Sequence, residues 1–110
     1  MLSINTFGTL QVLSEGKPVP LPTSRKTRAL LAYLVLTAAP QRRERLCELL
    51  WDLPDDPRGA LRWSLSKLRR VVNSSEETLL QADRERVGID VESIEVDFRK
   101  FRKLVENEDS

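Results

Sequence analysis

Basic side chains crowd one short stretch of this sequence, between Arg58 and Val72. The stretch holds no Asp or Glu. Guanidinium groups form paired hydrogen bonds with guanine edges and bind phosphates, so this composition favours contact with duplex DNA. On these residues alone, a solvated basic helix face is an equally good interpretation. The candidate DNA-contacting residues in the stretch are Arg58, Arg62, Trp63, Ser66, Lys67, Arg69 and Arg70.

Other candidates lie where helices are predicted to begin or end. Arg25 and Lys26 fall in the first turn of a predicted helix, where positive charge opposes the helix dipole and a docked phosphate would offset the cost. Ordinary solvated bases explain them equally well. Trp51 ends a second predicted helix, either as core or as an indole N–H donor to phosphate. Arg43, at the start of that helix, is a further candidate DNA-contacting residue.

Arg84 and Arg86 lie between two short apolar runs of strand-like composition. The pattern predicts a β-hairpin over 79–89 with its tip at 83–86. A hairpin that directly follows a basic helix is called a wing, and its tip commonly lies over a minor groove or the DNA backbone. A plain surface turn is the alternative, because the acidic neighbours of both arginines would repel phosphate.

Composition excludes several classes of enzyme. The chain has 110 residues, no histidine and one cysteine, Cys47, which removes disulfides, Cys/His metal sites and Ser–His–Asp triads. Cys47 lies among leucines, which favours a buried structural thiol over a reactive one. Because Gly-rich phosphate loops and paired carboxylates are absent too, we expect a protein that is not an enzyme and needs no cofactor.

Charge and hydropathy limit the possible partners and the cellular location of the protein. The net charge is only +1, which argues weakly against nucleic acid, but the charges are segregated. Residues 58–72 carry five cations and no anion, whereas 73–110 carry eleven acids and six bases. No apolar run reaches membrane-spanning length and the N-terminus lacks a signal-peptide pattern, so we expect a cytoplasmic protein without membrane contact.

Helical signals place the basic stretch on one surface. Asp56 is suited to cap a helix and Pro57 to its first position. The preceding helix, predicted over 43–51, and the loop 52–56 give the helix-turn-helix order. One narrow apolar stripe, expected to face the core, contains Leu61, Leu65, Leu68 and Val72.

The remaining segments predict a small α+β domain. Residues 2–21 have the composition of short strands with a turn at Glu15-Gly16, and prolines confine the third strand to an edge. Thr23 or Ser24 caps a helix that continues to about Ala38, with Leu30, Leu31, Leu34 and Val35 on its apolar face. In the second helix Leu46, Cys47, Leu49 and Leu50 are predicted to point inward. A short strand is predicted at 94–96, and Asp97 caps a last helix.

The domain boundaries follow from these elements. Residues 1–97 are predicted to form one DNA-binding domain, with an N-terminal antiparallel sheet at 1–22, a three-helix core at 23–73 and a wing at 78–90. Residues 98–110 are predicted to be a C-terminal helix and tail, or the start of a following domain.

Several phrases of the sequence, in this order, resemble one family. They are INTFGTLQVLSEGKPVPLPTSRKTRALLAYLVL, RERLCELLW, ALRWSLSKLRRVV, LLQADRERVGID and VDFRKF. Together they are similar to the N-terminal domain of SARP-type bacterial transcriptional activators, which belong to the OmpR/PhoB-type winged helix-turn-helix class. The resemblance covers nearly the whole chain. It implies sequence-specific binding to double-stranded promoter DNA, often as tandem copies on direct repeats, and contact with RNA polymerase.

The resemblance also assigns roles by position. The helix 57–72 becomes the recognition helix in the major groove, with Ser66, Lys67, Arg69 and Arg70 in its groove-facing part. Trp51 matches a tryptophan that touches phosphate, and Arg84 and Arg86 fall at the wing. Trp63 is bulky for a groove, and the loop 52–56 is short for polymerase contact. In this family an activation domain normally follows, so we expect an excised domain or a stand-alone regulator.

Two other functions remain as hypotheses from the sequence. The same fold serves as a protein–protein interaction module, in which the basic helix face meets an acidic partner. Salt-dependent binding to random duplex DNA separates this alternative from a DNA-binding regulator. An enzyme has almost no support.

Overall fold

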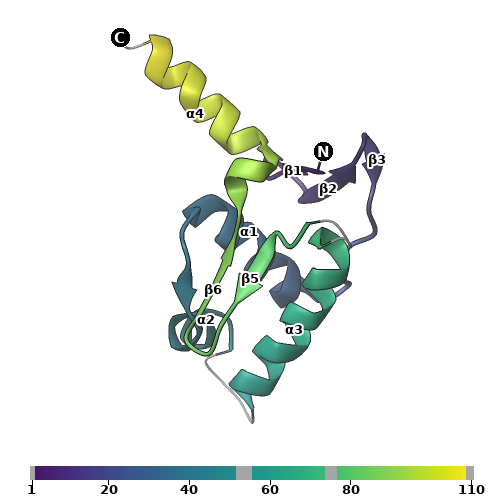
Figure 1. Ribbon diagram of the computed structural model, residues 1–110, viewed down its shortest axis with the longest axis vertical. Coiled ribbons are helices and arrows are strands. Elements are labelled where there is room, and N and C mark those ends of the chain that lie inside the picture. The colour runs from purple at the N-terminus through teal and green to yellow at the C-terminus, as the bar shows by residue number, and fades with distance from the viewer. Residues whose placement is uncertain (1, 52–55, 74–76, 109–110) are drawn as a thin grey trace.

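The protein, seen in a computed structural model, is described over residues 2–51, 56–73 and 77–108. Figure 1 shows helices and two small sheets in one body, from which the last helix projects, and the molecule measures 48 × 31 × 25 Å. The elements are, in order, β1 (Leu2–Asn5), β2 (Gln11–Ser14), β3 (Lys17–Pro18), α1 (Arg25–Thr37), β4 (Gln41–Arg42), α2 (Arg43–Leu50), α3 (Pro57–Val72), β5 (Leu80–Ala82), β6 (Arg86–Ile89), the 3-10 turn η1 (Val91–Ser93), β7 (Glu95–Val96) and α4 (Asp97–Glu108).

The first sheet has the strand order β3-β2-β1-β7. Its first three strands are antiparallel, and the β2–β3 turn is made by Glu15 and Gly16, both with positive φ (51° and 80°). β3 lies at the edge, as its prolines predict. β7, in contrast, pairs in parallel with β1, so the expectation of a purely antiparallel sheet is incomplete.

The helix α1 begins and packs as its sequence predicts. The Ser24 hydroxyl accepts the backbone N–H of Thr27 at 3.2 Å and so satisfies one of the first-turn donors. Its apolar face is fully covered by the rest of the protein. The buried aliphatic residues of α1 are Leu30, Leu31, Leu34 and Val35.

The short helix α2 buries less than expected. Leu46 is fully buried, and Cys47, Leu50 and Trp51 are partly buried against the core. Leu49 is exposed, so the prediction that it points inward is wrong. A helix of eight residues presents only a narrow stripe to its neighbours, and Leu49 lies off that stripe.

The helix α3 has the predicted start and the predicted inner stripe. The Asp56 carboxylate accepts the backbone N–H of Gly59 at 3.0 Å, and Pro57 occupies the first turn. The inner stripe also includes Ser64, whose hydroxyl lies 2.8 Å from that of Thr27 in α1. The whole stripe is buried, namely Leu61, Ser64, Leu65, Leu68 and Val72.

The second sheet is the predicted hairpin with one extra strand. β5 and β6 are antiparallel, and β4 pairs with the other edge of β6 to give the order β4-β6-β5. Gly88 permits this close approach, because a Cβ there would come within 3.2 Å of the Cα of Pro40. The sheet therefore joins the chain just before α2 to the hairpin just after α3 (Figure 1).

The helix α4 is fixed to the first sheet only at its start. The carboxylate of Asp97 accepts the backbone N–H groups of Thr6 (2.8 Å), Phe7 (2.9 Å) and Phe98 (2.7 Å). Phe7 also stacks edge-on against Phe101, with 5.7 Å between ring centroids. Beyond this point the helix is exposed and projects from the body (Figure 1). None of the described helices is long and apolar enough to cross a membrane.

Candidate nucleic-acid interface

The outer surface of α3 is basic, and the inner stripe of the same helix orients it. With the leucines facing the core, Arg62, Arg69 and Arg70 are exposed and Lys67 is half-buried. Within the described part of the chain these four side chains form no ion pair with a carboxylate. We define the basic face as the cations of α3 and the wing tip that share this property: Arg58, Arg62, Lys67, Arg69, Arg70 and Arg84.

A groove brings the helix-turn-helix and the wing tip together. Four of the predicted site residues line it: Arg43 from α2, Arg58 and Arg62 from α3, and Arg84 from the wing. Cys47 forms part of its wall. These cations come from segments far apart in the sequence. The same groove is also lined by four carboxylates, namely Glu44, Glu48, Asp56 and Glu85, so its charge is mixed, and among the described residues the surface free of ion pairs is the outer side of α3 beside it.

A set of hydrogen bonds fixes the wing tip. The side-chain Nε of Arg43 donates to the carbonyl oxygen of Asp83 at 2.7 Å, and its backbone N–H donates to that of Glu85 at 2.8 Å. The Asp83 carboxylate accepts the backbone N–H groups of Arg86 (2.7 Å) and Glu85 (2.8 Å). We call these four residues, Arg43, Asp83, Glu85 and Arg86, the tip cluster.

Of the two acidic residues at the tip, Asp83 uses its carboxylate to accept backbone N–H groups, whereas Glu85 lines the groove. The N–H groups of Arg86 and Glu85 hold the pKa of Asp83 below its usual value, with smaller help from the charges of Arg43 and Arg86. No ion pair joins Asp83 to Arg84 or Arg86 among the residues that the structure describes. The carboxylate stabilises the turn.

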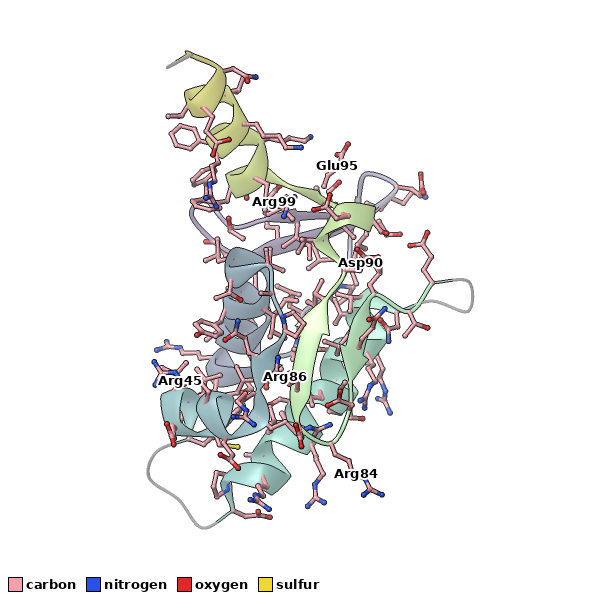
Figure 2. All side chains as sticks on the ribbon, turned by 60° about the vertical axis from the view of Figure 1, so that its left-hand side comes forward. Arg45, Arg84, Arg86, Asp90, Glu95 and Arg99 are labelled. Atoms are coloured by element: carbon pink, nitrogen blue, oxygen red, sulfur yellow. The ribbon has the colours of Figure 1, made fainter. Side chains whose placement is uncertain are left out.

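The two wing arginines lie on different surfaces. Arg84 lines the groove beside α3. Arg86 lines a second hollow, together with Pro40, Gln81 and Gly88, on the outer face of the three-stranded sheet. Figure 2 shows Arg84 at the hairpin tip and Arg86 further along the strand. Because the two side chains lie on different surfaces, a partner that contacts Arg84 in the groove does not thereby contact Arg86.

The indole of Trp63 lies beside Lys67, one turn further along α3. The Nζ of Lys67 is 5.3 Å from the ring centroid, within the range of a cation–π contact. Trp63 remains 52% exposed, so it offers an apolar surface in the middle of the basic face. Ser66, on the same outer side, is also exposed.

The remaining predicted residues lie outside the groove. Arg25 and Lys26 are exposed in the first turn of α1, whose Thr27 contacts Ser64 near the middle of α3. Trp51 follows α2 directly and is partly buried against the core. The predicted acidic loop 52–56 lies, apart from Asp56, outside the described residues.

Two parts of the site were not predicted from the sequence. Arg42 lines the groove, but its strand β4 has two residues, too few to show an alternating pattern. The role of Asp83 in the tip was also missed, although an Asp two or three residues before its backbone partners is a typical turn signal.

Cys47 lines the groove and is half-buried. Burial raises the pKa of its thiol despite the nearby charges of Arg58 and Arg43, and this favours an unreactive side chain.

Three of the four cations of α4 contrast with the basic face. Arg99 forms an ion pair with Glu92 at 2.8 Å, Lys100 with Glu95 at 3.3 Å, and Arg102 with Glu106 at 3.4 Å. Figure 2 shows Arg99 and Glu95 at the opposite end of the molecule from Arg84.

The order of these elements defines the class of the fold. A three-helix unit with a basic third helix, followed directly by a hairpin and preceded by a small sheet, is the arrangement of a winged-helix domain.

Comparison with known proteins finds a similar solved structure. The structure is similar to that of Mycobacterium tuberculosis EmbR, solved in complex with a low affinity phosphopeptide, with a TM-score of 0.71 and 28% identity. The match covers 80% of this chain and only 24% of EmbR. The similarity supports a SARP-like winged-helix domain. No family model and no curated protein matches the chain.

Proposed function

We propose that this domain binds double-stranded DNA sequence-specifically as part of a bacterial transcription regulator, with α3 in the major groove. The observation that carries the proposal is the basic face, whose six cations come from α3 and the adjoining wing tip and form no ion pairs among the described residues. Phosphate binding by such cations releases counterions and is favourable, whereas a cation already paired with a carboxylate gains less.

The geometry suits a two-part contact. A single helix fits the major groove, where arginine side chains read guanine edges, and α3 is exposed along its outer side. Arg84 of the wing lies beside the start of α3. We propose that it contacts the flanking phosphates or the minor groove. Arg25, Lys26 and Trp51 are proposed as outlying phosphate contacts.

The test is selection of bound sites from a random pool of duplex DNA, followed by binding measurements across a salt series. We expect one enriched motif and a steep loss of affinity with rising salt. Absence of salt-dependent binding to any duplex contradicts the proposal. The number and spacing of half-sites in the motif also show whether two copies bind direct repeats, as the family resemblance implies.

Three finer features of the proposal come from the resemblance. They are activation of transcription, contact with RNA polymerase and a cytoplasmic setting. Transcription in vitro from a selected promoter site checks the first two, with activation as the expected result.

Protein binding is a second candidate, favoured by one observation. Trp63 is 52% exposed beside Lys67, and tryptophan and arginine are typical of the centres of protein interfaces. In that case Trp63→Ala abolishes binding to an acidic protein partner while the domain shows no affinity for random duplex DNA.

A further inference from the structure

Among the described residues, the hydrogen bonds between α2 and the wing tip all come from Arg43. β4 runs beside β6 and pairs Arg42 with Arg86, so the next residue reaches the tip. Arg43 then contributes both its backbone N–H, to the Glu85 carbonyl oxygen, and its side-chain Nε, to the Asp83 carbonyl oxygen. One residue thus bonds to both sides of the turn.

Arg84 is the residue that this arrangement leaves available. Asp83 donates its backbone N–H to the Arg86 carbonyl oxygen at 2.9 Å, and its carboxylate binds the N–H groups of Glu85 and Arg86. Arg84 takes part in none of these bonds, and its side chain lines the groove with Arg58 and Arg62. The tip is held by its neighbours while Arg84 faces the groove.

We infer that Arg43 is a positioning residue: it fixes the wing relative to α2 and α3 so that Arg84 meets the phosphate backbone while α3 occupies the major groove. This inference rests on the proposed function. It changes the role of Arg43, which the sequence predicted to be a direct DNA contact. The Nε atom already donates to the Asp83 carbonyl oxygen, so this bond fixes the side chain at the wing tip, while the guanidinium, which has five N–H donors, still lines the groove.

Two substitutions separate positioning from direct contact. Glutamine carries an N–H₂ donor the same number of bonds from Cα as the arginine Nε, but no charge. Arg43→Gln therefore keeps a donor for the Asp83 carbonyl oxygen, whereas Arg43→Ala loses both donor and charge. Arg45→Gln is the matched control, because Arg45 is on the same helix, 59% exposed, and paired with Glu48. Figure 2 shows Arg45 well apart from Arg84.

The first measurement is affinity for a labelled duplex of random sequence across a salt series. We expect Arg43→Ala to weaken binding about two- to tenfold, the net value of one hydrogen bond, and Arg43→Gln to rescue most of that loss. The salt slope of Arg43→Gln should equal that of Arg45→Gln. If Arg43 binds phosphate directly, Arg43→Gln instead loses as much affinity as Arg43→Ala, and its slope falls by about 0.9.

A double-mutant cycle adds a second criterion. If Arg43 acts through Arg84, Arg43→Ala has little further effect in the Arg84→Ala background. Additive losses, or no loss from Arg43→Ala, overturn the inference.

The third measurement needs no DNA. Hydrogen exchange at the backbone N–H groups of Glu85 and Arg86 reports whether the turn is held, and we expect faster exchange in Arg43→Ala and near-native exchange in Arg43→Gln. Unchanged exchange in Arg43→Ala overturns the positioning role. If exchange changes as expected but the wild-type domain binds no duplex, the proposed function fails and the structural role of Arg43 stands.

Discussion

Positive side chains have different surroundings at the two ends of the protein. At the α3 and wing end, Arg62, Arg69 and Arg84 form no ion pairs within the described residues and border exposed surface. At the α4 end, Arg99 and Lys100 have carboxylate partners from η1 and β7 at 2.8 Å and 3.3 Å. Net charge alone, +1 for the whole chain, conceals this difference. The comparison shows that the pairing of charges, more than their number, identifies a surface suited to an anionic partner.

The two ends also differ in how far their apolar side chains are buried. Leu65 of α3 is 1% exposed, whereas Leu104 of α4 is 64% exposed. The helix that carries the basic face is therefore supported by the core, and α4 is supported only where it begins.

The largest expected effect tests this support. Leu65→Ala should lower the free energy of unfolding by about 2–5 kcal/mol, because it leaves a cavity between α3 and its neighbours. That is a large part of the usual margin of about 5–15 kcal/mol. Leu104→Ala is the matched control and should change stability by less than about 0.5 kcal/mol. Chemical denaturation followed by circular dichroism measures both; native stability of Leu65→Ala would contradict the inner stripe.

The second prediction compares the cations of the two ends directly. Arg62→Ala combined with Lys67→Ala should relax specificity and weaken binding to the selected site, by about 1–3 kcal/mol for each bidentate hydrogen-bond pair to a base that the substitutions remove. Both side chains lie off the buried stripe, so the melting temperature should remain near native. Arg99→Ala combined with Lys100→Ala removes two charges from the other end and should leave affinity nearly unchanged. An equal decrease in affinity in both double variants would break the comparison.

A third prediction concerns the wing. Replacing Arg84 and Arg86 together with Ala should lower affinity for most sequences alike, since phosphate contacts carry little sequence information. The salt slope should fall by about 0.9 for each phosphate no longer neutralised. Because Arg86 faces the other side of the sheet, Arg84→Ala alone should account for most of the change. If affinity and slope of the double variant both equal those of wild type, the hairpin does not contact DNA.

The smallest expected effect is a pH dependence at the α4 end. Burial raises the pKa of Asp97, but hydrogen bonds from Phe7, Thr6 and Phe98 outweigh this and hold it below the ordinary value. Asp97 therefore contributes stability that is complete above its unfolded pKa of about 3.9 and is lost as pH falls through the lower folded value. Asp97→Asn should be less stable than wild type at neutral pH and should converge toward it in acid, as thermal melts across pH 2–7 would show. A constant difference between the two across that range would contradict this role.

Local signals in the sequence predicted the elements that carry the candidate site. Asp56, Pro57 and the leucine stripe define α3, because caps and helical periodicity act over a few residues. The hairpin was predicted for the same reason, since strand composition on both sides of a polar tip is local. The similarity to EmbR supports the winged-helix fold. The DNA contacts assigned to individual residues remain predictions.

Longer-range features could not be read in the same way. β4 has two residues, and its partner in β6 lies more than forty positions away, so no local pattern marks it. The bonds from Arg43 to the tip depend on that pairing and were missed with it. Leu49 was wrongly predicted to point inward because the sequence shows only that it is apolar. Whether it is buried depends on which neighbouring elements pack against the short helix α2, and these leave it exposed.

The parallel pairing of β1 with β7 has a consequence for the timing of folding. Ile4 of β1 and its partner Val96 of β7 are separated by 92 positions, so β1 must wait until most of the domain has been synthesised. At typical elongation rates this delay is on the order of ten seconds, during which one edge of β1 lacks its final neighbour. An uncovered strand edge of this kind is a template for wrong pairing, so the nascent chain should depend more on chaperones before residue 97 emerges from the ribosome than afterwards.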